Sequence, residues 1–160
     1  MASLDEMPFK IRVFLTTYPW RRIDPPAWAP LPRPLSECRL GLVTSGGLSM
    51  PDQPPFDETV KGGDWSYRWI PLDAKLPSLV ESHKSDAFDH RGLAADRNLA
   101  LPLDRGHELV AAGRLGELNR RHLSFMGSIT APGRLIAESA PEAAAGFVAD
   151  GVDVALLVPV

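Results

Sequence analysis

The sequence predicts an α/β fold, a Rossmann-like layered sheet with a parallel component, from the order of a few segments. Residues 152–160 read Val-Asp-Val-Ala-Leu-Leu-Val-Pro-Val, a near-continuous apolar run that is typical of a parallel strand buried on both faces. This run follows a helical segment and a glycine, and residues 39–48 form an earlier strand candidate that enters a glycine turn. Strand, turn, helix and strand in this order indicate a parallel sheet with helices packed against it.

Composition narrows the class of protein. A length of 160 residues suits one domain, and a net charge of −3 does not suggest a nucleic-acid partner, because phosphate-binding proteins usually carry a basic surface. The sequence has no apolar stretch long enough for a membrane span and no secretory signal at residues 1–10. The single cysteine, Cys38, cannot form an internal disulfide, so we expect a reducing, cytoplasmic location.

Residues 1–38 are predicted to form a proline-rich arm, and residues 39–160 the α/β domain. Six of the 16 prolines fall between residues 19 and 34, where they exclude a helix or a central strand. Trp20 and Trp28 are available to pin this segment onto a surface. The alternative is a plain connector.

The first strand, at residues 39–48, enters the turn Ser45-Gly46-Gly47. This turn either presents backbone N–H groups to a ligand or only reverses the chain. Alternating aromatic and polar residues predict a second strand at 65–72, and a short strand at 78–82 and an apolar segment at 99–103 follow.

The next helix is predicted to begin at Asp104, its expected N-cap, and to end or kink at Gly113 or Gly116. Its expected buried stripe consists of Leu109, Val110, Leu115 and Leu118. Residues 122–127 then form a loop or a short strand.

The last helix is predicted from both of its ends. Ser139 and Glu142 have the spacing of a capping box, and Pro141 is tolerated in a first turn. Gly151 suits the left-handed position that follows a helix. The terminal strand begins directly after this glycine.

The densest polar cluster lies within residues 82–90, which hold His83, Asp86, Asp89 and His90. His122 can join this cluster from a distant part of the sequence. Such side chains orient a substrate, transfer protons near neutral pH or bind a divalent metal. The spacing matches no metal-binding motif, so we assign no metal ligand. The alternatives are a metal-dependent enzyme that uses this cluster and a solvated loop without catalytic function.

Two further residues have an open interpretation. Arg121 is a candidate clamp for a substrate carboxylate, because a guanidinium pairs with a carboxylate through two hydrogen bonds; the alternative is a solvated basic pair with Arg120. His122 stands beside apolar residues, so a structural role is its alternative. Cys38 precedes the first strand and therefore lies at the end of the sheet that is wrong for a ligand site.

Five groups of residues occur in an order that is known from one family. They are Ser82-His83 with Asp89-His90, Leu101-Pro102-Leu103-Asp104-Arg105, His122-Leu123-Ser124-Phe125-Met126-Gly127, Asp150-Gly151-Val152-Asp153 and Leu156-Leu157-Val158-Pro159-Val160. Together they resemble the selenoprotein B family, the catalytic-subunit family of the glycine, sarcosine, betaine and D-proline reductases, and are closest to its proline reductase branch. The resemblance runs from about Arg39 to Val160.

The resemblance implies an oxidoreductase that reductively cleaves a C–N bond in a small amine or amino acid. In such enzymes a selenocysteine, followed shortly by a cysteine, attacks carbon, and a dithiol redox protein regenerates it. Our candidate catalytic residues are His83, Asp89, His90 and His122. Our candidate substrate-binding residues are Ser45, Gly46, Gly47 and Arg121.

The nucleophile of the family cannot be assigned to any residue here. In the family its motif directly follows the strand that corresponds to residues 152–160, and this sequence has nothing after Val160. Because UGA encodes selenocysteine and is also a stop codon, our hypothesis is that a UGA follows codon 160. We therefore expect no cofactor in this chain, an incomplete domain and no activity of the chain alone. An ordinary stop codon with no α/β coding sequence downstream would contradict this hypothesis.

A terminal strand without neighbours exposes an apolar edge, so we expect a homo-oligomer or a partner subunit. The other expected partners are a small-molecule substrate and a dithiol redox protein; no nucleic acid or membrane is expected. A non-catalytic binding or scaffold subunit is the alternative function.

Overall fold

The computed structural model describes residues 7–18, 24–26, 29–83, 85 and 90–160. The chain divides into two compact units, Met1–Pro30 and Leu31–Val160. The first unit contains α1 (Phe9–Thr17), a helix that the sequence analysis did not anticipate. Trp20 and Trp28 lie outside the described residues, and the expected boundary after residue 38 stays a prediction.

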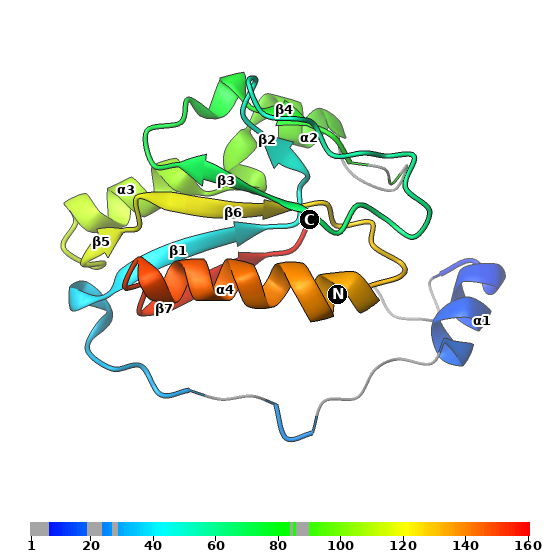
Figure 1. Cartoon of the computed structure of the whole chain (residues 1–160), viewed down its shortest axis with the longest axis horizontal. Helices are drawn as coiled ribbons and strands as arrows, with labels where there is room; N and C mark the ends of the chain where they lie inside the picture. Colours follow the sequence, from blue (N-terminus) through cyan, green and yellow to red (C-terminus); the bar gives the residue numbers. More distant parts are fainter. Residues whose placement is uncertain (1–6, 19–23, 27–28, 84, 86–89) are drawn as a thin grey trace. The chain divides into compact units, whose positions relative to one another are not determined.

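The second unit is built on a mixed five-stranded sheet (Figure 1). Its strands are β1 (Arg39–Thr44), β3 (Tyr67–Pro71), β5 (Glu117–Leu118), β6 (Arg121–Phe125) and β7 (Val154–Val158). Central β1 pairs in parallel with β7 on one side and with β5 and β6 on the other, and β3 lies antiparallel on the outside of β6. A separate antiparallel pair joins β2 (Leu48–Ser49) to β4 (Val80–Glu81). The predicted α/β fold with a parallel component is confirmed.

Helices cover the two faces of the sheet, as the alternation of side chains along β1 requires. Leu40 and Leu42 point into the core that also holds Leu103 at the start of α3 (Leu103–Ala111). On the opposite face, Phe147 of α4 (Ala140–Ala149) packs over Gly41, where an added Cβ would lie 2.6 Å from the ring. The short helix α2 (His90–Ala95) belongs to the α3 side.

The helix ends agree with the sequence at the glycines and differ from it at the caps. Gly113 and Gly151 adopt φ values of +66° and +72° directly after α3 and α4, as predicted. Asp104 is not an N-cap, because α3 already begins at Leu103 after Pro102. Ser139 makes no capping hydrogen bond, because a π-helical turn, Leu135–Ser139, runs directly into α4 and leaves no free helix start there.

The terminal strand differs most from its prediction. A strand buried on both faces was expected, but the side chains of Leu156 and Leu157 in β7 are 46% and 68% exposed. Within the described residues, β7 pairs only with β1 and is therefore an outer strand of the sheet. The apolar run therefore has the composition of an interior strand and the position of an edge strand.

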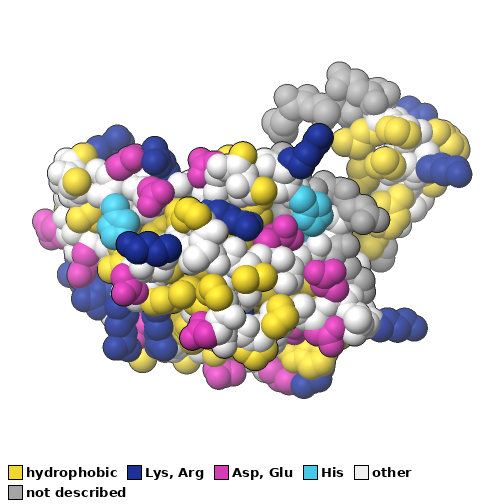
Figure 2. All heavy atoms as spheres, turned by 90° about the horizontal axis from the view of Figure 1, so that it is seen from above, with side chains coloured by type: hydrophobic (Ala, Val, Ile, Leu, Met, Phe, Trp, Pro, Cys, Tyr) yellow, Lys and Arg dark blue, Asp and Glu magenta, His cyan; other side chains and the backbone are white. Residues whose placement is uncertain are grey.

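Charged residues of both signs share the surface. On the face shown in Figure 2, Lys and Arg side chains gather at the lower left and elsewhere lie among Asp and Glu side chains. Among the described residues, no helix combines the length and apolarity needed to cross a membrane.

Candidate functional site

The carboxyl ends of β1, β6 and β7 meet at one edge of the sheet, on the right of Figure 1. We call the segments that continue these strands, Ser45–Gly47, Met126–Gly127 and Pro159–Val160, the strand-tip edge. In open parallel sheets this is where ligands bind.

The turn Ser45-Gly46-Gly47 joins the three strand ends. The N–H groups of Ser45, Gly46 and Gly47 donate to the Val158 carbonyl at 3.2 Å, to Thr44 Oγ1 at 3.0 Å and to the Phe125 carbonyl at 2.9 Å. These donors are therefore already engaged within the protein. Ser45 Oγ accepts from the N–H of Val160 at 3.0 Å, which leaves the hydroxyl proton of Ser45 to donate to a ligand.

Two glycines allow the connections at this edge to approach one another closely. Gly47 has a φ of +64°, and an added Cβ would lie 2.4 Å from the Ser82 carbonyl oxygen. At Gly127 a Cβ would lie 2.8 Å from the Ser45 carbonyl oxygen and 3.0 Å from His83 Nε2. The His83 imidazole is thus packed directly against the strand tips.

Glu81, which the sequence analysis did not single out, holds two of the predicted histidines. Its Oε1 accepts from the backbone N–H of His83 at 3.0 Å, and its Oε2 lies 3.0 Å from His90 Nδ1. Its position two residues before His83, on β4, is the sequence signal that could have identified it. We call Glu81, His83 and His90 the histidine cluster.

Burial gives His83 a defined protonation state. The side chain is 7% exposed, and this burial lowers the pKa of His83, with the Glu81 carboxylate acting in the opposite direction. Nδ1 accepts from the N–H of Ser85 at 3.2 Å, so the neutral ring carries its proton on Nε2, the atom that faces Gly127. Asp89, the other predicted member of this cluster, lies outside the described residues, as does Asp86.

His122 lies within the sheet, in β6, rather than at the strand-tip edge. Strand β1 pairs with β5 at residues 39–40 and with β6 only from Val43, which leaves a gap in the hydrogen-bond ladder. His122 Nδ1 fills the gap by accepting from the N–H of Leu42 at 3.1 Å. Burial lowers the pKa of His122 to about 4, with a smaller contribution from His107. This geometry favours the structural interpretation, and the catalytic one stays a prediction.

Arg121 lies at the opposite edge of the sheet, where it begins β6 and contacts Asp150 at the end of α4. It binds Asp150 through Nε–Oδ2 and Nη2–Oδ1 distances of 2.6 and 3.1 Å, and its guanidinium lies 3.9 Å from the centre of the Trp69 ring. Hydrogen bonds from Arg121, and then from Arg120 and Asn119, hold the pKa of the Asp150 carboxyl far below its usual range. The structure therefore does not bring Arg121 to Ser45, Gly46 and Gly47.

The thiol of the chain is also remote from the strand tips. Cys38 is fully buried at the start of β1, the edge opposite to Ser45. Among the described residues, no three His, Cys, Asp or Glu side chains are grouped as a metal site would require. Among the described residues, the strand-tip edge carries His83 and the Ser45 hydroxyl but no thiol.

An apolar cavity of about 330 Å³ adjoins the strand-tip edge on the α4 side of the sheet. It is lined by Val43, Thr44, Ser45, Phe125, Leu157, Val158 and Pro159. Its walls are mostly aliphatic, and the Ser45 hydroxyl is one of few polar groups there. A small, largely apolar substrate fits such a cavity.

Comparisons with known proteins identify relatives. The model of the family described as glycine/sarcosine/betaine reductase selenoprotein B matches residues 5–159. D-proline reductase subunit gamma of Acetoanaerobium sticklandii is 31% identical over 133 residues, which cover 83% of this chain and 53% of the relative. The chain therefore spans about half the length of this relative, and no solved structure matches it. From the extent of the family match, we conclude that this chain is a member of the glycine/sarcosine/betaine reductase selenoprotein B family.

Proposed function

We propose that this chain supplies the proton-transfer groups of a reductase that cleaves the C–N bond of a small amine or amino acid. The observation that carries the proposal is the histidine cluster, in which His83 Nε2 faces Gly127 at the strand-tip edge that the apolar cavity also adjoins. Family membership supports reductase chemistry, and the relative's name supports an amino acid as substrate.

The nucleophile comes from outside these 160 residues in this proposal. Cys38, the one cysteine of the sequence, is buried at the opposite edge of the sheet, so it does not reach a substrate at the strand tips. A selenocysteine or cysteine that follows Val160 would lie at the strand-tip edge, where Pro159 lines the apolar cavity. A selenolate suits this role because it is ionised at neutral pH.

The proposed reaction uses the histidines as proton donors. The selenolate attacks the carbon that bears the amine, and the C–N bond breaks with its electron pair leaving on nitrogen. A histidine of the cluster in its imidazolium form, His83 or His90 beside Glu81, passes a proton to the departing nitrogen and becomes neutral imidazole. A dithiol protein then reduces the carbon–selenium bond, which releases the deaminated product and leaves the dithiol as a disulfide.

The test uses the assembled enzyme, purified from its source cells through a tag on this chain. We expect dithiothreitol-dependent release of ammonia or a methylated amine from glycine, sarcosine or betaine, or dithiothreitol-dependent ring opening of D-proline to 5-aminopentanoate. His83→Gln should lower kcat by about 10²-fold or more, because general acid catalysis contributes at least that much. His107→Gln, the same replacement at an exposed position on α3, is the control. Absence of turnover with all four substrates, or an unchanged kcat in both His83→Gln and His90→Gln, would refute the proposal.

A non-catalytic scaffold subunit is the second candidate, and the position of Cys38 favours it. A chain whose own thiol is buried away from the strand tips can position a substrate without reacting with it. Co-purification of a partner, without dithiol-dependent turnover and without bound transition metal, would support this candidate. Bound metal would instead support the metal-dependent alternative.

The cellular location and the partners of the chain follow from the same proposal. A dithiol donor and a free thiol at Cys38 suit a reducing cytoplasm. The relative is a subunit by name, which supports partner subunits for this chain as well.

A further inference from the structure

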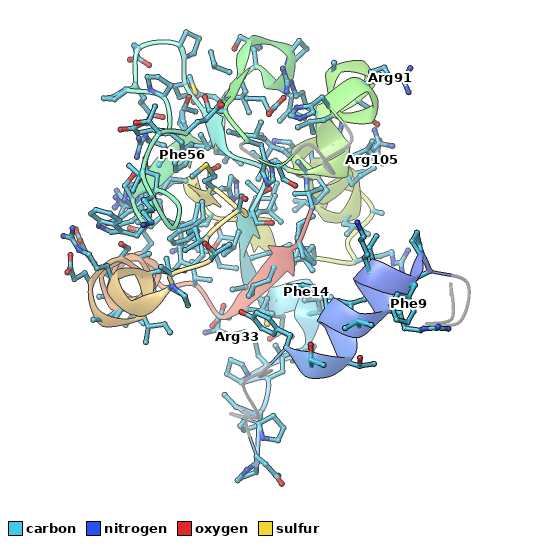
Figure 3. All side chains as sticks on the ribbon, turned by 90° about the vertical axis from the view of Figure 1, so that its right-hand side faces the viewer. Phe9, Phe14, Arg33, Phe56, Arg91 and Arg105 are labelled. Carbon is cyan, nitrogen blue, oxygen red and sulfur yellow. The ribbon has the colours of Figure 1, made fainter. Side chains whose placement is uncertain are left out.

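We propose that a second cavity at the strand-tip side of α4 binds an organic cation of the ammonium class. The cavity measures about 290 Å³ and lies between the start of β3 and the first turn of α4. It is lined by Trp65, Ser66, Tyr67, Glu138, Ser139 and Glu142. Figure 1 shows that α4 begins on the side where β1 and β6 end, and Figure 3 shows α4 end-on from that side.

The lining combines the two features that attract an organic cation. Aromatic faces attract cations through the ring quadrupole, and carboxylates supply the opposite charge. The protein already holds one cation in this way, because the guanidinium of Arg134 lies 3.7 Å from the centre of the Trp65 ring. Arg134 also binds Glu138 through two hydrogen bonds of 3.0 and 2.9 Å. Trp65 and Glu138 therefore already bind a planar cation, the guanidinium of Arg134, which does not itself line the cavity.

Glu142 supplies a negative charge that no basic side chain neutralises within the described part of the chain. Its contact is with the hydroxyl of Tyr67, whose pKa is raised by burial and then by this hydrogen bond. Glu138 is matched by Arg134, so Glu142 is the carboxylate left to pair with a ligand. Tyr67 stands beside it as an aromatic wall.

The cavity adjoins the candidate site through one pair of rings. Tyr67 of β3 is paired with Phe125 of β6, and the two ring centres are 5.8 Å apart. Phe125 also lines the apolar cavity that contains Ser45. The two cavities thus lie on either side of the Tyr67–Phe125 pair. The inference that the bound cation is the amine of the substrate rests on the proposed function, whereas cation binding itself does not.

Calorimetric titration of the full chain with tetramethylammonium chloride tests cation binding, and tert-butanol serves as a neutral probe of similar shape. We expect tetramethylammonium to bind about tenfold more tightly than tert-butanol, since cation–π attraction and a carboxylate act only on the charged probe. Glu142→Gln and Trp65→Leu should each weaken its binding about tenfold. Glu108→Gln, an exposed carboxylate on α3, is the matched control and should leave it unchanged.

Three results would overturn the inference. These are equal affinity for the two probes, undiminished binding in Glu142→Gln, and no binding of tetramethylammonium at all. In the last two cases Glu142 serves only as the hydrogen-bond acceptor of the Tyr67 hydroxyl. Thermal unfolding of each variant shows whether it is folded.

In the assembled enzyme, Glu142→Gln should raise KM for the amine with kcat unchanged. Cation binding without that change would retain the site and reject its link to catalysis.

Discussion

His122 fills a gap between two strands and thereby couples stability to pH. Its neutral ring accepts the Leu42 N–H, and burial lowers its pKa from 6.5 to about 4. The unfolded chain therefore binds a proton at a higher pH than the folded chain does. Stability is fully present above pH 6.5 and falls as the pH drops from 6.5 to about 4.

We expect the free energy of unfolding to decrease by on the order of 3 kcal/mol over this interval. Urea denaturation at several pH values measures it. His122→Leu should be less stable at pH 7, because the Leu42 N–H loses its acceptor, and should show a smaller dependence on pH. A part of the dependence will persist, since burial also lowers the pKa of His83. Identical pH profiles for the two proteins would contradict the assignment.

Gly47 permits the close contact between the strand-tip turn and the end of β4. Gly47→Ala places a side chain at a φ of +64° and a Cβ 2.4 Å from the Ser82 carbonyl oxygen. We expect a loss of about 2 kcal/mol or more, because both the backbone and the neighbouring segment must shift. Gly133→Ala is the matched control, since its Cβ would meet no atom within 4 Å, and it should change stability by less than about 0.5 kcal/mol. Equal melting temperatures for the two variants would refute this explanation.

Among the elements, the two outer strands of the sheet are protected very differently. The outer edge of β3 is covered by a loop, in which Gln53 Nε2 donates to the Trp69 carbonyl and Arg68 binds the carbonyls of Pro54 and Pro55. Strand β7 has no such cover within the described residues, and Leu157 is 68% exposed. Charged side chains and proline normally prevent such an edge from pairing with another chain.

We therefore expect the purified chain to associate with itself through β7 at micromolar concentration. Leu157→Lys should shift it towards the monomer, because a charged side chain opposes burial of the strand. Light scattering coupled to size-exclusion chromatography measures the mass. Val148→Lys, at a 77% exposed position on α4, is the control and should not change the mass. A monomeric wild-type chain would contradict the prediction.

For the whole second unit, the residues at the carboxyl ends of the parallel strands differ in chemistry from those at the amino ends. The strand-tip edge carries the histidine cluster, the Ser45 hydroxyl and both cavities proposed to bind the substrate. At the other edge, Asp150 is saturated by Arg120, Arg121 and Asn119, an arrangement that fixes the end of α4 to the start of β6. Asp150 is engaged by three side chains and stabilises the fold, whereas the Ser45 hydroxyl lines a cavity, where it can act on a ligand.

The sequence by itself determined the α/β class, the glycine helix ends at Gly113 and Gly151 and the family, because these depend on local patterns and motifs. It also singled out His83 and His90, whose catalytic role stays a prediction. Only the tertiary structure placed Arg121 at the far edge, His122 inside the sheet and Glu81 between two histidines. It also left the apolar residues of β7 exposed. An element's burial depends on which strands and helices pack beside it, and no pattern within the element itself contains that information.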